Sequence, residues 1–312
     1  RGSDMASVDG GHLRIARQQL HQAVGALEMV GSGAPAHVLR CMEAAVQKFV
    51  EKPALCNEAA SAKVERAGFA LTEYLEGVLM GKPASAVALF PQYRDVQELA
   101  GADRIHPADL WGMEWRWNDP ATPPEREARV YDPAVRARMD QAVLKVVKTG
   151  DQHAAHELTK IGLSLAATQA ARQPRIFWKI CAAYFEAVGL GLLPLDIYVK
   201  RAASRVLLQY ASLAKGELGV SDRLAQDLLF FCFQAVPANE ADAPSLVAVR
   251  KAWGLSRSTP VDYQTAQYGR FDPILLSQAR KRIVAAKETW SALSGGEVGK
   301  LKGLADQFHL VS

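Results

Sequence analysis

A histidine and a glycine stand one helical turn apart in the strongly helical segment that runs from Leu20 to Gly31. The imidazole of His21 could attack an acyl phosphate, and Gly25, at i+4, would leave room for a partner protein to approach. Arg17, at i−4, lies on the same helix face and could support the charge of a phosphoryl group. These three residues form the candidate catalytic site, with His21 as the candidate phosphoacceptor.

Val24 departs from the pattern that this chemistry requires. The histidine phosphotransfer pattern, His-x-x-Lys-Gly, has a lysine at this position to neutralise the incoming phosphoryl group. Without it, a phosphohistidine loses a charge-assisted hydrogen bond worth about 1–3 kcal/mol. The guanidinium of Arg17 approaches the imidazole from the other side and need not reach the same oxygens. We therefore favour an inert His21 on a protein-binding surface, and an active phosphoacceptor is the alternative.

A second segment, around His156, has the same residue types as the phosphotransfer pattern but at a different spacing. Lys160 is at i+4 from His156, but Gly162 is at i+6 and points away from the imidazole. His153 and His156, spaced i and i+3 without a further placed ligand, are weak evidence for a metal. We interpret this segment as a solvated helix face and predict neither a metal nor a cofactor.

The length, composition and net charge of the chain limit the classes of function that it can have. A chain of 312 residues that is 49% hydrophobic can form about two domains. Its net charge of +4 arises from 37 basic and 33 acidic residues that are well mixed, which argues against nucleic acid as a partner. No apolar run is long enough for direct membrane insertion, and no Gly-x-x-x-x-Gly-Lys-Ser/Thr loop is present to bind ATP.

The four cysteines do not predict a disulfide framework or a zinc site. They are scattered and lack C-x-x-C spacing, so we expect reduced thiols in helices and a cytoplasmic protein. Cys181 and Cys232 lie in apolar runs, where a thiol is usually an inert small hydrophobe. The four residues are Cys41, Cys56, Cys181 and Cys232.

Apolar residues recur at spacings of three and four along most of the chain, which predicts an all-α fold. Asp132 followed by Pro133 is a typical N-cap and N1 pair. No β-branched alternating run bounded by turn signals appears. The predicted helices cover about 13–30, 36–50, 59–80, 86–99, 133–150, 152–172, 174–189, 194–215, 221–236, 243–253 and 273–293.

The helices group into two predicted domains. Residues 8–100 should form an antiparallel four-helix bundle, because short loops join four consecutive helices. Residues 132–312 should form a second, larger all-α domain. Residues 1–7 are expected to be a disordered vector remnant.

Residues 101–131, rich in tryptophan and proline, are predicted to be an ordered linker between the two domains. Trp111, Trp115 and Trp117 could form a stacking platform for a ligand, but such a cluster more often packs against neighbouring domains. We favour the packing interpretation. A small-ligand-binding helical domain with a pocket near these rings remains a further alternative.

Five segments carry a resemblance to a known family. The sequence resembles the N-terminal region of the large chemotaxis-like hybrid histidine kinases that govern type IV pili and twitching motility. The matching segments are ARQQLHQAVGALEMV at 16–30, ALFPQYR at 88–94, HPADL at 106–110, FWKICAAYFEA at 177–187 and YGRFDP at 268–273.

The resemblance implies a histidine-phosphotransfer-type bundle within a two-component signalling protein whose parent is a histidine kinase, while this region itself is not catalytic. It implies protein partners, namely receiver domains, a kinase core or pilus-regulatory scaffold proteins. It also implies that such partners recruit the chain to the cell pole or the inner membrane face. The function that we expect is a non-catalytic, phosphotransfer-like scaffold module; an active phosphotransfer domain using His21 is the first alternative.

Overall fold

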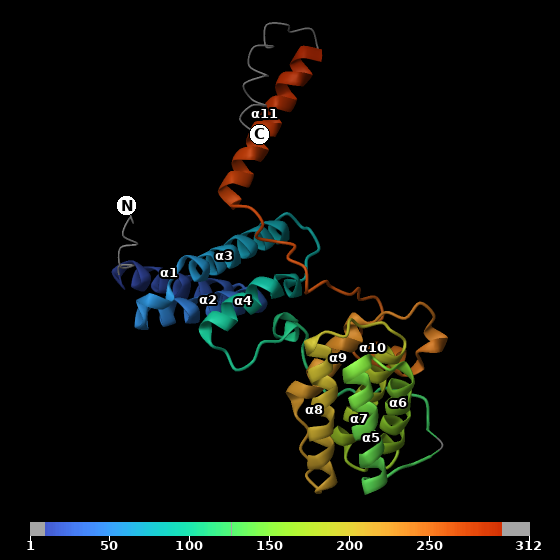
Figure 1. The fold of residues 1–312 in the computed structure, drawn as a ribbon. Coiled ribbons are helices and arrows are strands. Elements are labelled where there is room, and N and C mark those ends of the chain that lie inside the picture. The colour runs from blue at the N-terminus through green and yellow to red at the C-terminus, as the bar shows by residue number, and fades with distance from the viewer. Residues whose placement is uncertain (1–9, 126, 295–312) are drawn as a thin grey trace. The chain divides into compact units, whose positions relative to one another are not determined.

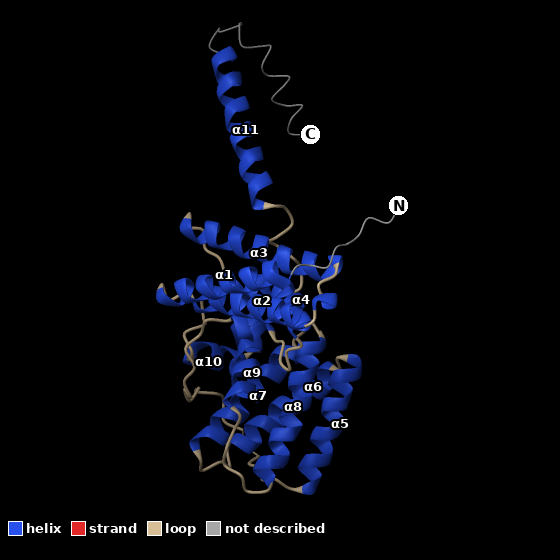
Figure 2. Ribbon diagram, turned by 90° about the vertical axis from the view of Figure 1, so that its left-hand side faces the viewer, coloured by secondary structure: helices blue, strands red, loops and turns tan. Residues whose placement is uncertain are grey.

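The computed structural model describes residues 10–125 and 127–294. This part of the chain contains eleven α-helices joined by loops and short 3-10 turns, and it contains no strand (Figure 2). The predicted all-α fold is therefore confirmed. The predicted vector remnant at 1–7 lies outside the described residues.

The described chain divides into two compact units. Unit 1 holds residues up to Leu110 together with those from Asp262 onward, and unit 2 runs from Trp111 to Val261. This division differs from the sequence-based boundaries of 8–100, 101–131 and 132–312. The tryptophan-rich segment falls in unit 2, and the last helix falls in unit 1.

Unit 1 begins with four helices, and its second helix lies at the centre. α2 packs against α1, α3 and α4, and Ala36, Val38, Ala45 and Phe49 of α2 are buried in the core. Pro91 lies in the first turn of α4, directly after a 3-10 turn over Ala86–Leu89, so α4 starts later than predicted. The helices are α1 (Gly10–Met29), α2 (Gly33–Glu51), α3 (Glu58–Leu79) and α4 (Phe90–Ala100) (Figure 1).

The chain from Asp262 onward returns to unit 1 through close contacts with α3 and α4. Tyr263 packs edge-on against Phe90, with ring centroids 6.0 Å apart, and the Gln92 side chain donates to the Tyr268 carbonyl at 2.8 Å. At Gly269, φ is +74° and an added Cβ would lie 2.7 Å from the Arg66 carbonyl, so only glycine fits. These contacts join the following helix, α11 (Pro273–Ser294), to unit 1.

Unit 2 is built around α7. Fourteen of the 18 residues of α7 are buried, including Trp178 and Tyr184, because this helix packs against α6, α9 and α10. A helix that is apolar nearly all round belongs in the middle of a domain. The helices are α5 (Pro133–Thr149), α6 (Gln152–Ala166), α7 (Arg172–Gly189), α8 (Ile197–Ala214), α9 (Asp222–Gln234) and α10 (Pro244–Ala252).

Local sequence signals explain most helix ends in unit 2. The carboxylate of Asp132 accepts a hydrogen bond from the Val135 amide at 2.8 Å, with Pro133 at N1, so the predicted N-cap is confirmed. The predicted helix 152–172 is too long, because α6 ends at Ala166. The Thr168 hydroxyl donates to the carbonyls of Leu165 and Arg129, which closes the helix and ties it to the preceding loop.

Two buried charged residues hold α9 and α10 in unit 2. The guanidinium of Arg250, only 4% exposed, donates to five backbone carbonyls. The Glu186 carboxylate accepts from the Leu246 amide at 2.7 Å, at the start of α10. The carbonyls bound by Arg250 belong to Cys232, Phe233, Ala235, Leu255 and Ser258.

Candidate functional site

His21 lies on the most exposed helix of the α1–α4 bundle. Only Leu13 and Val24 of the 20 residues of α1 are buried, and the His21 side chain is 74% exposed. A reacting protein could therefore reach the imidazole without any rearrangement of the bundle. Access, the first requirement for a phosphoacceptor, is met.

The imidazole of His21 is held by a carboxylate of the neighbouring helix. Its Nδ1 lies 3.1 Å from Oε1 of Glu43 on α2. If Nδ1 carries the proton, Nε2 keeps its lone pair and is the nucleophilic nitrogen. The same carboxylate, however, places a negative charge beside any phosphoryl group that His21 would accept. The contact with Glu43 orients the imidazole of His21 as a nucleophile. The negative charge of the Glu43 carboxylate, however, disfavours a phosphorylated His21.

Arg17 is hydrogen-bonded to α2. Its Nη1 donates to the side-chain oxygen of Gln47 at 3.0 Å, one turn along α2 from Glu43. At the other end of the same two helices, Glu28 pairs with Arg40. The three pairs form a polar seam between antiparallel helices, and His21 is its middle member. The seam gives both His21 and Arg17 a structural role that requires no phosphate.

Val24 and Gly25 are the residues at i+3 and i+4 from His21. Val24 is 6% exposed and packs in the core. The side chain of a lysine at this position would therefore point into the core. An added Cβ at Gly25 would meet no atom within 4 Å, so there is open space beside this glycine. The described site offers access at Gly25 and a nucleophile at His21, but it pairs no cation with the imidazole.

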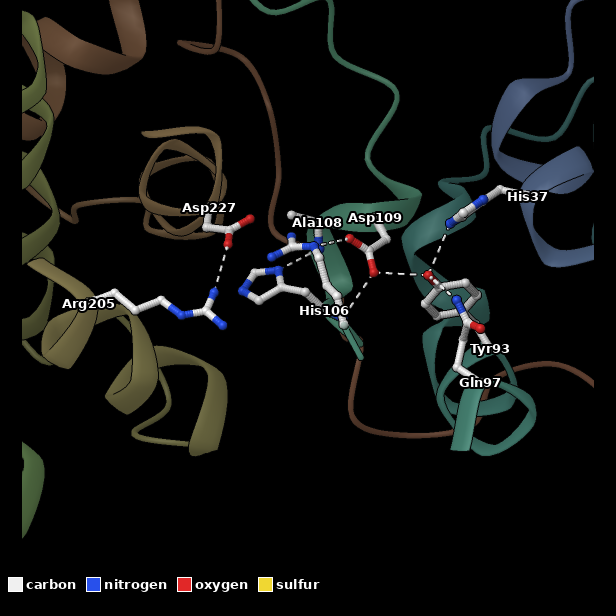
Figure 3. Close-up of polar contacts among 9 residues, drawn as sticks. His37, Tyr93, Gln97, His106, Ala108, Asp109, Arg205 and Asp227 are labelled. Carbon is white, nitrogen blue, oxygen red and sulfur yellow. Dashed lines mark hydrogen bonds and ion pairs between the residues drawn. The ribbon is translucent and has the colours of Figure 1, made fainter. Parts of the chain in front are cut away.

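A buried polar cluster that the sequence did not single out lies elsewhere in unit 1 (Figure 3). The Tyr93 hydroxyl donates to Asp109 at 2.9 Å and lies 3.0 Å from Nε2 of His37. Asp109 also accepts from Nε of Arg104 at 2.9 Å and from the His106 amide at 3.1 Å. Burial and the adjacent carboxylate raise the pKa of Tyr93.

This cluster ties α2 and α4 to the turn at Pro107–Leu110 (η3). Gln97, one turn after Tyr93, donates to the same hydroxyl at 2.9 Å. The Tyr93 side chain is buried, so the groups satisfy one another, as a structural network requires. Asp109 of the HPADL segment is the residue that joins these elements.

The three tryptophans of the predicted linker pack within unit 2. Trp111 stacks on Phe233 with centroids 5.2 Å apart, and Trp115 stacks on Trp253 at 6.0 Å. The indole of Trp117 donates to the Asp222 carboxylate at 2.8 Å. All three rings take part in packing or capping contacts, which is the role that we favoured over a ligand platform.

The second histidine segment behaves as its spacing predicts. His153 and His156 are exposed on α6, whereas Gly162 is buried where α6 meets α7. A Cβ at Gly162 would lie 3.1 Å from the Trp178 carbonyl, so this glycine serves helix packing. Among the described residues, no group of three or more His, Cys, Asp or Glu side chains is placed to hold a metal ion.

Three of the four cysteines are buried in the two cores. Desolvation raises the pKa of Cys41 to about 12 and raises those of Cys181 and Cys232 as well. A buried thiol with a raised pKa is a poor nucleophile. These residues act as small apolar side chains.

No helix in the described ranges is long and apolar enough to cross a membrane.

The comparisons with known proteins concern unit 2. Neither a curated protein nor a solved structure matches the chain. Residues 124–266, slightly less than half of the chain, match the family model described as the FimL scaffold protein second domain. This match covers α5 to α10 and ends in the segment that returns to unit 1.

Proposed function

We propose that this chain is a non-catalytic scaffold module of a chemotaxis-like signalling system that controls type IV pili. The observation that carries the proposal is the match of residues 124–266 to a domain of a scaffold protein. The resemblance of the α1 segment to pilus-controlling kinases supports the same pathway, and the polar seam beside His21 supports a binding role for this bundle. In this proposal, unit 1 is a phosphotransfer-like bundle that no longer carries phosphate.

The charge around His21 is the main physical support for an inert bundle. A phosphoryl group on His21 would bring nearly two negative charges next to Glu43. The candidate supporting cation, Arg17, already donates to Gln47. With Val24 in place of the lysine, nothing on the following turn compensates.

A phosphotransfer assay tests the proposal directly. The full chain is mixed with a phosphorylated receiver domain or an ATP-charged kinase core from the same system, and acid-labile, base-stable phosphate is measured. We expect no label on the wild-type chain, while a competent phosphotransfer domain added to the same mixture becomes labelled. The His21→Gln variant should also stay unlabelled and should keep its fold, because its side chain is mostly exposed.

Label that appears on the wild-type chain and disappears in His21→Gln would overturn the proposal. It would favour the alternative function, an active phosphotransfer domain, for which the orientation of the imidazole by Glu43 is the specific observation. In that case Glu43→Gln and Arg17→Gln would separate the orienting role of the carboxylate from the charge support of the guanidinium.

The partners in this proposal are proteins of the signalling pathway, such as receiver domains, a kinase core or other scaffold proteins. We also propose a cytoplasmic location in which these partners recruit the chain to the cell pole or the inner membrane face. Imaging of a fluorescent fusion in cells with and without the pilus chemotaxis-like cluster would test this part separately.

A further inference from the structure

We infer that one face of α11 in unit 1 binds an acidic helical segment of a partner protein. The inference rests on the proposed scaffold function and names one of its binding surfaces. The α11 face consists of Arg280, Ile283, Lys287 and Trp290, which are spaced three, four and three residues apart. Residues at these spacings lie along one side of a helix.

The apolar side chains of the α11 face are exposed. Ile283 is 56% exposed and Trp290 is 65% exposed, although α11 contacts α3 (Figure 1). The other five tryptophans of the chain are buried or half-buried, so Trp290 is the exception. Tryptophan is enriched among the residues that contribute most to protein–protein binding. An exposed tryptophan beside an exposed isoleucine therefore favours a protein-binding surface.

α11 concentrates the positive charge of the chain. It carries four basic residues and one acidic residue, so its net charge is +3, compared with +4 for the whole chain. Arg280 and Lys287 are exposed, and neither forms a hydrogen bond or an ion pair with a described residue. The one acidic residue, Glu288, lies about 100° around the helix from Lys287. The α11 face thus presents positive charge and no carboxylate.

The charge argues against a second copy of the chain as the occupant. In a pair of α11 faces, Arg280 and Lys287 of one copy would lie against the same two residues of the other. Like charges beside the seam of a helix pair repel each other. A helix with glutamate or aspartate beside its apolar residues would instead gain charge-assisted contacts with both side chains.

The distribution of apolar residues argues against a lipid bilayer. A helix that lies on a membrane separates its apolar face from its charged face. On α11, Lys287 lies on the same face as Ile283, one helical turn away, while Ile274, 66% exposed, lies on the opposite side of the helix. The mixture of basic and apolar residues on one face matches an amphipathic partner helix with acidic flanks.

Selection from a display library of random peptides of about 20 residues, long enough to form a helix, tests the inference with the full chain as bait at low salt. We expect the enriched peptides to combine acidic residues with apolar residues at spacings of three and four. Their affinity should fall about tenfold or more in Trp290→Ala and in Lys287→Glu, where repulsion replaces a charge-assisted contact. Ile283→Ala should weaken binding severalfold. These side chains are exposed, so circular dichroism should show an unchanged helix content.

Matched controls on the same helix isolate the α11 face. Lys281→Glu makes the same charge change as Lys287→Glu, and Ile274→Ala makes the same truncation as Ile283→Ala, in both cases away from the face. Both control variants should bind the selected peptides like the wild type. The inference is overturned if no peptide is enriched, if enriched peptides lack acidic residues, or if the control variants lose as much affinity as the face variants.

Two sedimentation experiments test the other occupants. We expect the chain neither to bind phosphatidylglycerol vesicles nor to self-associate through the α11 face. Vesicle binding that is lost in Lys287→Glu would overturn the inference in favour of a bilayer, and self-association that is lost in Ile283→Ala would overturn it in favour of a second copy. None of these outcomes depends on whether His21 accepts phosphate, so this inference and the proposed function can fail separately.

Discussion

The first helix of unit 1 and the central helix of unit 2 are similar in length but differ in what their polar residues do. α1 buries two of its 20 residues, and its Arg17, His21 and Glu28 lie along an exposed seam with α2. α7 buries 14 of its 18 residues, and its Glu186 is used inside the protein to hold the start of α10. Glu186 of α7 acts inside the fold, whereas the paired side chains of α1, His21 in particular, are exposed at the surface.

This difference explains why a motif on α1 and a domain match on unit 2 carry different information. The lysine position of the phosphotransfer pattern on α1 is taken by the buried Val24, so the helix packs well without the cation that the chemistry requires. The interior of unit 2 tolerates little change, because packing density and buried hydrogen bonds constrain each position. The match to the family model covers α5 to α10 of unit 2.

The largest effect that we expect comes from removing the buried guanidinium of Arg250. Arg250→Met leaves five buried carbonyls without their donor, and the free energy of unfolding of unit 2 should fall by about 3 kcal/mol or more. Arg17→Met on α1 is the matched control, with an expected change within about 0.5 kcal/mol. Urea denaturation followed by tryptophan fluorescence measures the change in unit 2, and circular dichroism measures the change in unit 1.

Five of the six tryptophans lie in unit 2, so the fluorescence signal reports mainly on this unit. Circular dichroism should be recorded in parallel, since the two units can unfold in separate steps. Equal losses in Arg250→Met and Arg17→Met would contradict the contrast between a structural interior and an exposed seam.

A pair of glycine substitutions tests the same contrast with a single methyl group. Gly162→Ala places a Cβ 3.1 Å from the Trp178 carbonyl and 3.3 Å from the Ala182 amide, so α6 and α7 must separate and unit 2 should lose about 1–3 kcal/mol. Gly25→Ala meets open space and should stabilise α1 by up to about 1 kcal/mol through helix propensity. The urea midpoints of both variants should therefore move in opposite directions.

Helix positions were predictable from the sequence because the apolar period of 3.6 residues is a local signal. Asp132 and Pro133 located the start of α5 for the same reason. The grouping of the elements was not predictable, because it depends on contacts between residues far apart in sequence. The Gln92 bond to the Tyr268 carbonyl and the close approach at Gly269 have no local signature.

The contacts between helices at the candidate site could not be predicted from the sequence either. The sequence placed His21, Arg17 and Gly25 on one exposed face, but nothing near His21 in the sequence indicated Glu43, which lies on the next helix. The buried network around Tyr93 and Asp109 was likewise hidden, since its members come from three separate segments. Polar partners across helices depend on packing geometry, which periodicity does not encode.

The smallest effect concerns the pH dependence of unit 2 stability. Burial raises the pKa of Glu186 above its ordinary value of 4.5, and the amides of Leu246 and Ser245 oppose the shift only in part. A carboxyl with a raised folded-state pKa stabilises the fold while it is protonated. This contribution is full below pH 4.5 and is lost as the pH rises through the folded-state pKa.

Glu186→Gln removes this titration and keeps an oxygen that can accept from the Leu246 amide. The stability of the variant relative to the wild type should therefore increase between about pH 4 and pH 7. Urea denaturation at the two pH values, with tryptophan fluorescence, measures the difference. A relative stability that stays constant, or that falls as the pH rises, would mean that the amides at the start of α10 fully compensate the buried charge, and that α7 tolerates an ionised side chain as easily as the exposed seam of α1 does.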